Sequence, residues 1–299
     1  MSEHYPVMAD EMERYLLGEA RAGERRTYCD CTAGSGGHAR RILARTSRSR
    51  LVAIDRDASA LERCRSSLRE FEGRVTYCHG AFSRIAEAVR EHQPIAGILA
   101  DLGLSRTQLD DAGRGFSLRL EGPLDMRFDR RQELCAWDLV NRGSERELAD
   151  LLYRLADERF SRRIARAVVR ARPVRDTRHL AEIAAGAVPR GARRRIHPAT
   201  RTFQALRMAV NDEIRELRAL LDAAPGLLAP GGRFVVISFH SGEDRLVKHS
   251  FRRLAAAGTH RVLTRRVVRP PAAEVARNRA SRSARLRAVC RARGAGARK

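Results

Sequence analysis

The sequence predicts an α/β fold, a doubly wound and mostly parallel sheet that is interrupted by a helical module. Apolar, strand-like runs begin near residues 27, 50, 75 and 95, and segments of helical periodicity separate them. The fourth run, 95–101, is continuously apolar up to its final acid, which is typical of a parallel strand buried on both faces. The next comparable run is 233–239, so this crossover is far longer than one helix requires.

The long crossover predicts an insertion. We expect residues 1–104 and 206–290 to form one discontinuous α/β domain, and residues 105–205 to form a helical module within it. Apolar side chains such as Leu148 and Leu152 lie on one stripe at helical spacing in that module. An all-helical substrate module is therefore expected.

Three features are expected after the insertion. Apolar residues from Phe203 to Leu221 recur at helical spacing and predict one continuous core helix. The runs 262–268 and 284–290 predict two further strands. The segment 291–299 is rich in arginine, glycine and alanine, which predicts a basic and disordered tail.

The composition is strongly basic. Among 299 residues there are 59 basic and 36 acidic side chains, a formal net charge of +23, and only Lys248 and Lys299 are lysines. A base-composition bias of the genome can replace lysine by arginine, but it does not create surplus charge. Because polyanion binding uses such a surplus for phosphate contacts, nucleic acid is the leading partner class. A solvated basic surface without a partner is the alternative.

Other signals point to an ordinary intracellular protein. The six cysteines are scattered without a C-x-x-C pair, so we expect reduced core or strand residues. Cys29 and Cys31 lack a second pair at zinc spacing, so no metal site is expected. The chain has no uncharged run long enough to span a bilayer, and its first residues do not resemble a signal peptide. A cytoplasmic protein with no membrane partner is expected.

A glycine-rich turn indicates a nucleotide-type cofactor. Gly34, Gly36 and Gly37 follow the first strand and precede a helix, where backbone N–H groups can face a ligand. Asp55 ends the second strand at the position where an acid can accept hydrogen bonds from a ribose diol. The turn does not meet the G-x-G-x-x-G pattern and Asp30 precedes it, which favours S-adenosylmethionine over NAD. An ordinary tight turn of an α/β protein is the alternative.

Longer motifs occur in order along nearly the whole chain. They are 30–38 (DCTAGSGGH), 53–57 (AIDRD), 79–83 (HGAFS), 101–105 (DLGLS), 122–127 (GPLDMR), 197–207 (HPATRTFQALR) and 238–241 (SFHS). In these motifs the chain resembles the bacterial 16S ribosomal RNA cytosine-N4 methyltransferases, the RsmH/MraW family. Several of the motifs are long and rare, so chance agreement is negligible.

The resemblance implies a class I S-adenosylmethionine-dependent methyltransferase, with a Rossmann-like sheet that ends in an antiparallel pair of strands and an inserted helical domain. The implied reaction is methylation of N4 of a cytidine, number 1402 of 16S ribosomal RNA, in the small ribosomal subunit. The family's cofactor positions correspond here to Gly36, Gly37, His38, Asp55, Phe82, Asp101 and Gln108.

Two residues are candidates for the chemistry on the amino group. The exocyclic N4 of cytosine is a poor nucleophile because its lone pair is delocalised, so an enzyme must orient it and accept its hydrogens. Asp101 ends the fourth strand and His240 follows the fifth, so we expect both to act as acceptors at the carboxyl edge of the sheet. The alternatives are a purely cofactor-binding carboxylate for Asp101 and a packed histidine for His240.

Arginines of the insertion are the candidates for RNA contacts. Arg193, Arg194 and Arg195 form a cluster just before the motif that contains Arg201. Four further arginines between 162 and 170 share one helical face. Phosphate binding is the functional interpretation of these side chains, and a solvated helix face is the alternative.

Two departures from the family pattern keep other functions open. Arg106 stands where a serine is usual and Gly242 where a leucine is usual, and both lie near the expected substrate entrance. The alternatives are a diverged paralogue that methylates another RNA site and a non-catalytic RNA-binding protein that retains the fold. The intact glycine turn, Asp55 and Asp101 favour an enzyme. The sequence leaves the oligomeric state open.

Overall fold

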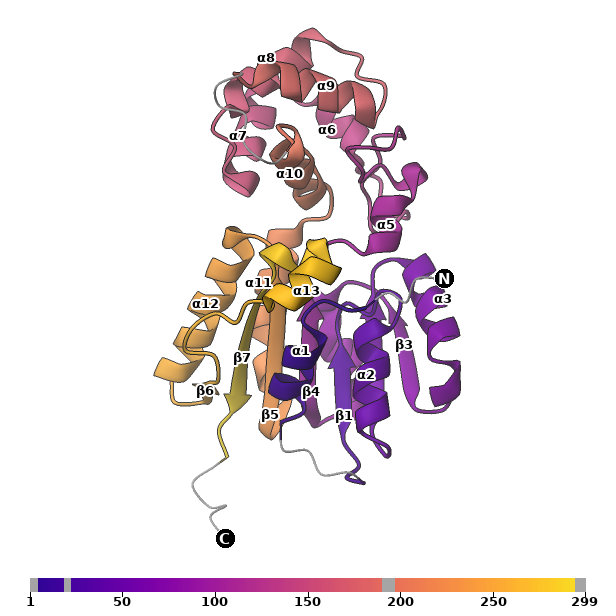
Figure 1. Ribbon diagram of the computed structural model, residues 1–299. Helices are drawn as coiled ribbons and strands as arrows, with labels where there is room; N and C mark the ends of the chain where they lie inside the picture. Colours follow the sequence, from indigo (N-terminus) through magenta and orange to yellow (C-terminus); the bar gives the residue numbers. More distant parts are fainter. Residues whose placement is uncertain (1–4, 19–22, 190–196, 294–299) are drawn as a thin grey trace. The chain divides into compact units, whose positions relative to one another are not determined.

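The computed structural model describes residues 5–18, 23–189 and 197–293, and the chain divides into two compact units (Figure 1). The first unit combines residues 1–103 with 215–299, and residues 104–214 form the second. The second unit ends at 214, later than the expected end of the insertion at 205. Each unit buries apolar clusters of its own, as independent domains do.

The described part of the first unit contains a mixed sheet of seven strands. The strands are β1 (Thr27–Asp30), β2 (Arg50–Asp55), β3 (Val75–His79), β4 (Ile95–Asp101), β5 (Leu228–Ser238), β6 (His260–Val262) and β7 (Arg285–Arg291). Their order is β3-β2-β1-β4-β5-β7-β6, in which β1 to β5 are parallel and β7 is antiparallel to both neighbours. This order confirms the predicted doubly wound fold. The strand order reverses its direction between β1 and β4, and sheets of this kind bind ligands in the crevice at the carboxyl ends of those two strands.

Helices cover both faces of the sheet (Figure 1). They are α1 (Ala9–Leu16), α2 (Gly37–Arg45), α3 (Ala58–Ser67), α4 (Ile85–Ala88), α11 (Glu213–Leu227), α12 (Ser241–Ala256) and α13 (Ala272–Arg277), with 3-10 turns η1 (Arg69–Phe71), η2 (Phe82–Arg84), η3 (Arg90–His92) and η6 (Arg279–Ser283). Leu99 of β4 shares a core with Met12 and Ile42, whereas its neighbour Ile98 joins Leu220 on the other face. Alternate side chains of β4 fill opposite cores, which explains its unbroken apolar run.

The sixth strand differs from the expected one. β6 is confined to 260–262, whereas the apolar pattern predicts a strand over 262–268. The N–H of Ala288 in β7 donates to the side-chain hydroxyl of Thr264 at 3.0 Å instead of to a backbone carbonyl. Because this hydroxyl takes a place in the hydrogen-bond ladder, the backbone leaves the sheet there and returns only for an isolated bridge at Val268.

The C-terminal end of the sheet is longer than expected. β7 includes Arg291, the residue at which a disordered tail is predicted to begin. The N–H of Ala292 also donates to the carbonyl of Thr259 at 2.9 Å. Backbone pairing with the preceding segment therefore overrides the flexible composition of this stretch, and 294–299 lie outside the described residues.

The second unit is helical throughout its described residues. Its helices are α5 (Arg106–Asp110), α6 (Ala136–Arg142), α7 (Glu145–Ala156), α8 (Ser161–Arg170), α9 (Thr177–Ala187) and α10 (Thr200–Val210), with the 3-10 turn η4 (Ala112–Arg114). Leu148 and Leu152 of α7, Ile164 of α8 and Leu206 of α10 share its core. The expected helical insertion is confirmed, because the apolar stripes of separate helices supply this common core.

The single helix predicted over 203–221 is wrong. Asn211 and Asp212 separate α10 from α11, and Asp212 has a φ of 49°, in the left-handed region. The Asn211 amide donates to the carbonyl of Met126 at 2.7 Å, and its oxygen accepts the N–H of Phe128 at 2.8 Å. The apolar residues before the break join the core of the second unit, and those after it join a core of the first. Tertiary packing therefore overrides the helical periodicity.

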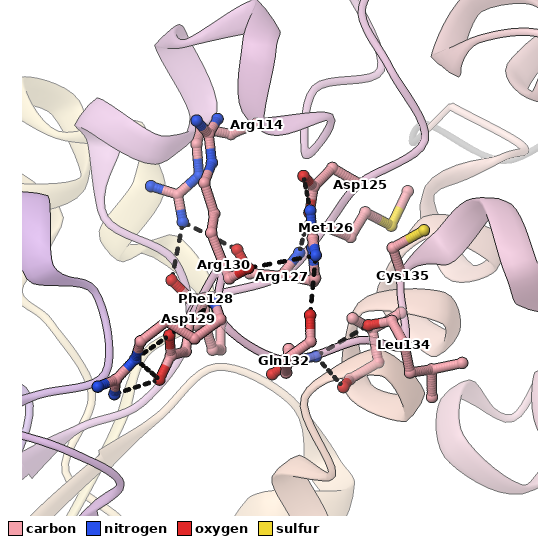
Figure 2. A network of polar contacts seen from close by, with 12 residues as sticks. Arg114, Asp125, Met126, Arg127, Phe128, Asp129, Arg130, Gln132, Leu134 and Cys135 are labelled. Atoms are coloured by element: carbon pink, nitrogen blue, oxygen red, sulfur yellow. Dashed lines mark hydrogen bonds and ion pairs between the residues drawn. The ribbon is translucent and has the colours of Figure 1, made fainter.

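A network of polar contacts fixes the irregular chain between α5 and α6 (Figure 2). Arg127 binds Asp125 through two N–H···O contacts of 2.8 and 2.9 Å. The buried guanidinium of Arg114 donates to the carbonyls of Arg127 and Phe128, at 2.8 and 3.1 Å. Met126, at a φ of 59°, is fully buried between these contacts. Side chains thus supply the hydrogen bonds that a helix or strand would otherwise give this loop.

Candidate active site

The glycine turn lies at the carboxyl end of β1, directly before α2. Gly34 and Gly36 have φ values of 54° and 86°, which glycine adopts without strain. The Asp55 carboxylate holds the turn by accepting the N–H of Gly34 at 2.8 Å and, through its other oxygen, the N–H of Asp57 at 2.9 Å. Gly36 is the N-cap of α2 and supplies no side-chain cap. The first N–H groups of α2 are therefore available to an anionic group of a ligand.

Three ionisable side chains meet at the carboxyl ends of β1 and β4. Asp30 ends β1, Asp101 ends β4, and His38 is in the first turn of α2. Nε2 of His38 lies 3.4 Å from Oδ2 of Asp101. The Thr32 hydroxyl accepts the N–H of Asp101 at 2.7 Å, and the N–H of Thr32 donates to Asp30 at 3.1 Å. Thr32 thus connects the two acids across neighbouring strands.

Several polar atoms of this cluster are buried without a hydrogen-bond partner. They are Oδ2 of Asp30, Oδ1 of Asp101 and both ring nitrogens of His38. Folded proteins leave few such atoms, so their concentration beside the glycine turn indicates a ligand site. Acceptor oxygens suit the cationic groups of S-adenosylmethionine, and Asp55 and the turn suit its ribose and its carboxylate. The residues present therefore fit this cofactor.

The environment of Asp30 shifts its protonation. Burial raises the pKa of Asp30 from its ordinary 3.8 to about 6. Attraction to His38 and the hydrogen bond from Thr32 oppose this rise in pKa, while repulsion from Asp101 and Asp55 adds to it. Burial also raises the pKa of Asp55, although its two N–H contacts act in the opposite direction. Burial therefore favours the protonated forms of Asp30 and Asp55, and a cation bound nearby would favour their carboxylate forms.

Replacing Asp30 with asparagine is expected to flatten the pH dependence of stability between pH 4 and 6. The pKa of Asp30 is higher in the folded than in the unfolded chain, so its protonation stabilises the fold below the unfolded pKa, and this is lost as the pH rises through about 6. The loss amounts to about 3 kcal/mol by pH 7 in the parent. Asp30→Asn retains an acceptor for the N–H of Thr32 but has no carboxyl group to titrate. The free energy of unfolding of this variant should therefore not fall between pH 4 and 6.

Chemical denaturation at several pH values measures this difference. The matched control is Asp222→Asn, which changes an exposed acid of α11 and should follow the pH dependence of the parent. If the stability curves of Asp30→Asn and the parent run parallel from pH 4 to 7, the raised pKa of Asp30 is wrong.

The predicted cofactor residues fall in both units. Gly36, Gly37, His38, Asp55, Phe82 and Asp101 all belong to the first unit, at or after the carboxyl ends of β1 to β4. Phe82 lies in η2 and is half-buried against the core of that unit. Gln108 belongs to the second unit, where its Oε1 accepts the N–H of Ser105 at 3.0 Å in a capping box that begins α5. The geometry thus assigns Gln108 a local capping role.

The predicted RNA-binding residues are only partly described. Arg201 lies on α10 and donates to the carbonyl of Asp157 at 2.7 Å, which satisfies the end of α7. Arg193, Arg194 and Arg195 lie outside the described residues. The arginines of α8 that follow one face are exposed, as both phosphate binding and a solvated face require.

His240 forms the N-cap of α12. Its Nδ1 accepts the N–H of Glu243 at 3.4 Å, so the neutral ring carries its proton on Nε2, 3.1 Å from Oε1 of Glu243. The buried Glu243 completes the capping box by accepting the N–H groups of Phe239 and His240, at 3.0 and 3.3 Å. Nε2 of His240 is buried and makes no hydrogen bond. The role of His240 as an acceptor of substrate hydrogens stays a prediction.

Sequence reasoning alone does not assign roles to Asp30 and Thr32. The available signal is an acid and a hydroxyl directly before the glycine turn. That signal cannot show that Thr32 contacts Asp101, which is 69 residues away in the chain. The contact follows from the pairing of β1 with β4.

The fold and this site define the class of protein. A parallel sheet with a glycine turn after its first strand, acids at the ends of β2 and β4, and an antiparallel last strand is the arrangement of class I methyltransferases. The chain is a methyltransferase of this class, and its cofactor is S-adenosylmethionine. The model of the MraW methylase family matches residues 1–292, and the chain belongs to that family.

Curated relatives match almost from end to end. The chain is 47% identical over 288 residues to a protein of Solibacter usitatus, covering 96% of this chain and 99% of the relative. It is 49% identical over 298 residues to one of Koribacter versatilis, covering 96% and 94%. A protein of Synechococcus elongatus is 46% identical over 287 residues, covering 95% and 93%. All three carry the name ribosomal RNA small subunit methyltransferase H.

Three further features of the described ranges concern membranes, metals and thiols. Within them, no helix has both the length and the apolar character needed to cross a membrane. No group of three or more histidine, cysteine or acidic side chains is placed there to hold a metal ion. All six cysteines are free thiols, and Cys29, Cys31 and Cys64 are buried in the core.

Proposed function

We propose that this enzyme methylates N4 of a cytidine in 16S ribosomal RNA, which the family resemblance identifies as cytidine 1402. The observation that carries the proposal is the partnerless, buried Oδ1 of Asp101 at the carboxyl end of β4, beside the cofactor turn. Relatives of nearly half-identical sequence that match almost from end to end, named as small-subunit ribosomal RNA methyltransferases, support the substrate class. The surplus of positive charge suits an RNA partner.

The cofactor is proposed to bind along the carboxyl ends of β1 to β3. The turn at Gly36 and Gly37 and the start of α2 would hold the methionine part, Asp55 the ribose hydroxyls, and Phe82 one face of the adenine. When bound, S-adenosylmethionine supplies an electrophilic methyl group on a positively charged sulfur.

Asp101 is proposed to activate the amino group. The N4 lone pair is delocalised into the ring, so a carboxylate that accepts an N–H of the amino group both orients the nitrogen and stabilises its developing positive charge. As N4 forms a bond to the methyl carbon, the carbon–sulfur bond breaks and one N4 proton must leave. Oδ1 of Asp101 is available to accept that proton, while His38 lies beside Oδ2.

His240 is proposed to position the end of β5 rather than to touch the substrate. Its Nδ1 already accepts the N–H of Glu243 in the capping box, which fixes the turn between β5 and α12. Asp101 pairs with Ile237 of β5, so this turn lies beside the strand end that bears the proposed acceptor. Asp101 therefore remains the candidate catalytic residue of the first unit.

Replacing Asp55 with alanine is expected to weaken cofactor binding by about 1.5 to 3 kcal/mol, the scale of a hydrogen bond to a charged group. The change removes the proposed ribose acceptor and the contact that holds Gly34. Titration calorimetry with S-adenosylmethionine measures the loss. Asp55→Asn, which keeps one acceptor oxygen, should lose less than Asp55→Ala, and equal affinity of all three proteins would refute the role of Asp55.

Mass mapping of methylated cytidines tests the proposed reaction. In 16S ribosomal RNA from cells that lack this gene, cytidine 1402 should lose its N4-methyl group and regain it when the gene is restored. A different cytidine that responds would establish the diverged paralogue. No responding nucleotide, together with RNA binding by the purified protein, would establish the non-catalytic alternative. Naked 16S ribosomal RNA and isolated small subunits, offered separately, identify the form of the substrate.

A further inference from the structure

The positive charge of this chain is concentrated in one stretch of the first unit. Residues 241–293 contain fifteen arginine and lysine side chains but only three acids, which is a net charge of +12 out of +23 for the whole chain. In this stretch, β7 and β6 form one edge of the sheet and α12 packs against them, whereas α13 contacts the segment before α1 through Glu274 (Figure 1). An arginine-rich genome alone does not explain why acids are nearly absent from this one stretch.

All three acids of the stretch are used inside the fold. Glu243 is buried and caps α12. Glu274 is buried and accepts the N–H of Met8 at 2.8 Å. Asp244 receives two N–H groups of Arg287, at 2.6 and 3.1 Å, in a mostly buried pair. The stretch therefore adds almost only cations to the solvent-facing surface, where Arg253 pairs with the exposed Asp222 of α11.

A small cavity lies between α12, β6 and β7 on this surface. It has a volume of about 30 Å³ and is lined by Lys248, Phe251, Arg252, Val262, Thr264, Arg265 and Arg287. Its lining thus includes four cationic side chains and no acidic one. Arg252 and Arg265 are exposed and Lys248 is half-buried. Cations around a hollow of this size can converge on a single anionic oxygen group such as a phosphate.

We propose that the 241–293 surface binds the phosphodiester backbone of the RNA substrate, with Lys248, Arg252 and Arg265 around one phosphate. The inference rests on the proposed function and adds a second RNA contact region, on the unit that carries the cofactor site. Its driving force is the release of counterions from RNA, which requires a surface with an excess of cations and few competing acids. The binding is independent of base identity, because phosphates carry no sequence information.

A charge-matched pair of variants tests this surface. The first combines Lys248→Gln, Arg252→Gln and Arg265→Gln. The control combines Arg65→Gln, Arg84→Gln and Arg178→Gln, which removes the same charge from exposed arginines that are each paired with an acid. Affinity for a 16S ribosomal RNA fragment is measured over a range of salt concentrations, and calorimetry with S-adenosylmethionine serves as the check on folding.

The first variant is expected to bind RNA roughly tenfold or more weakly, with the slope of log K against log salt reduced by about 0.7 to 0.9, since one phosphate contact is lost. The control should retain most of the parental slope. Equal losses in both variants, or no loss in the first, would overturn the proposal.

Vesicles of phosphatidylserine distinguish RNA from another polyanion. The parent should prefer RNA to these vesicles at equal salt, and a loss of vesicle binding without a loss of RNA binding in the first variant would overturn the proposal. Methylation of 16S ribosomal RNA by the parent is measured in the same series. Failure of that reaction counts against the proposed function, whereas a changed salt slope reports on this surface alone.

Discussion

Replacing Asp101 with asparagine is expected to lower methyl transfer about 10²- to 10⁴-fold, while RNA affinity and its salt dependence stay at the parental level. The range is that of a positioned group that takes a proton in the transition state. Asparagine keeps the shape and can still accept the amino hydrogen, but it cannot balance the developing charge or retain the proton. Single-turnover rates at saturating cofactor and RNA measure the effect on the chemical step directly.

The alternative role for Asp101, cofactor binding alone, gives a different result. In that case Asp101→Asn weakens the binding of S-adenosylmethionine, and the rate at saturating cofactor returns to the parental value. The matched control is Asp110→Asn, an exposed acid at the end of α5 that pairs with Arg106 and should react at the parental rate. Tenfold weaker RNA binding by Asp101→Asn would instead show that the carboxylate contacts the substrate ground state.

Replacing Asn211 with alanine is expected to destabilise the second unit by about 2 to 4 kcal/mol. The substitution leaves the carbonyl of Met126 and the N–H of Phe128 without their partner, and an unsatisfied buried group costs about 1 to 3 kcal/mol. The only tryptophan of the chain, Trp137, lies on α6 of this unit. Its fluorescence during denaturation with urea therefore reports on unfolding of the second unit.

Asn278→Ala provides the comparison for Asn211. The side chain of Asn278 accepts the N–H of Ala280, at 3.2 Å in an exposed turn, so its loss should cost less than about 1 kcal/mol. Asn211→Asp, which keeps the acceptor for Phe128 but loses the donor to Met126, should fall between the parent and Asn211→Ala. A tryptophan transition of Asn211→Ala that coincides with that of Asn278→Ala would contradict the anchoring role.

The sequence by itself determines the elements whose signals are local. The apolar runs of β1 to β4, the glycine turn at Gly34 and Gly36, and the helical stripes of the insertion each arise from neighbouring residues, and the structure has them where they are predicted. The motifs also lead to the family, because they are long enough to be specific without any knowledge of contacts. Local periodicity and turn chemistry are sufficient for these features.

Tertiary structure alone decides which polar groups are already used. Asp101 and His240 look alike in the sequence, as polar residues at strand ends, yet Oδ1 of Asp101 has no partner, whereas Nδ1 of His240 already accepts the N–H of Glu243. The apolar stripe through 203–221 likewise continues across Asn211 although the helix does not. At Asn211 the outcome depends on hydrogen bonds to a distant segment, and a pattern of neighbouring residues carries no information about such partners.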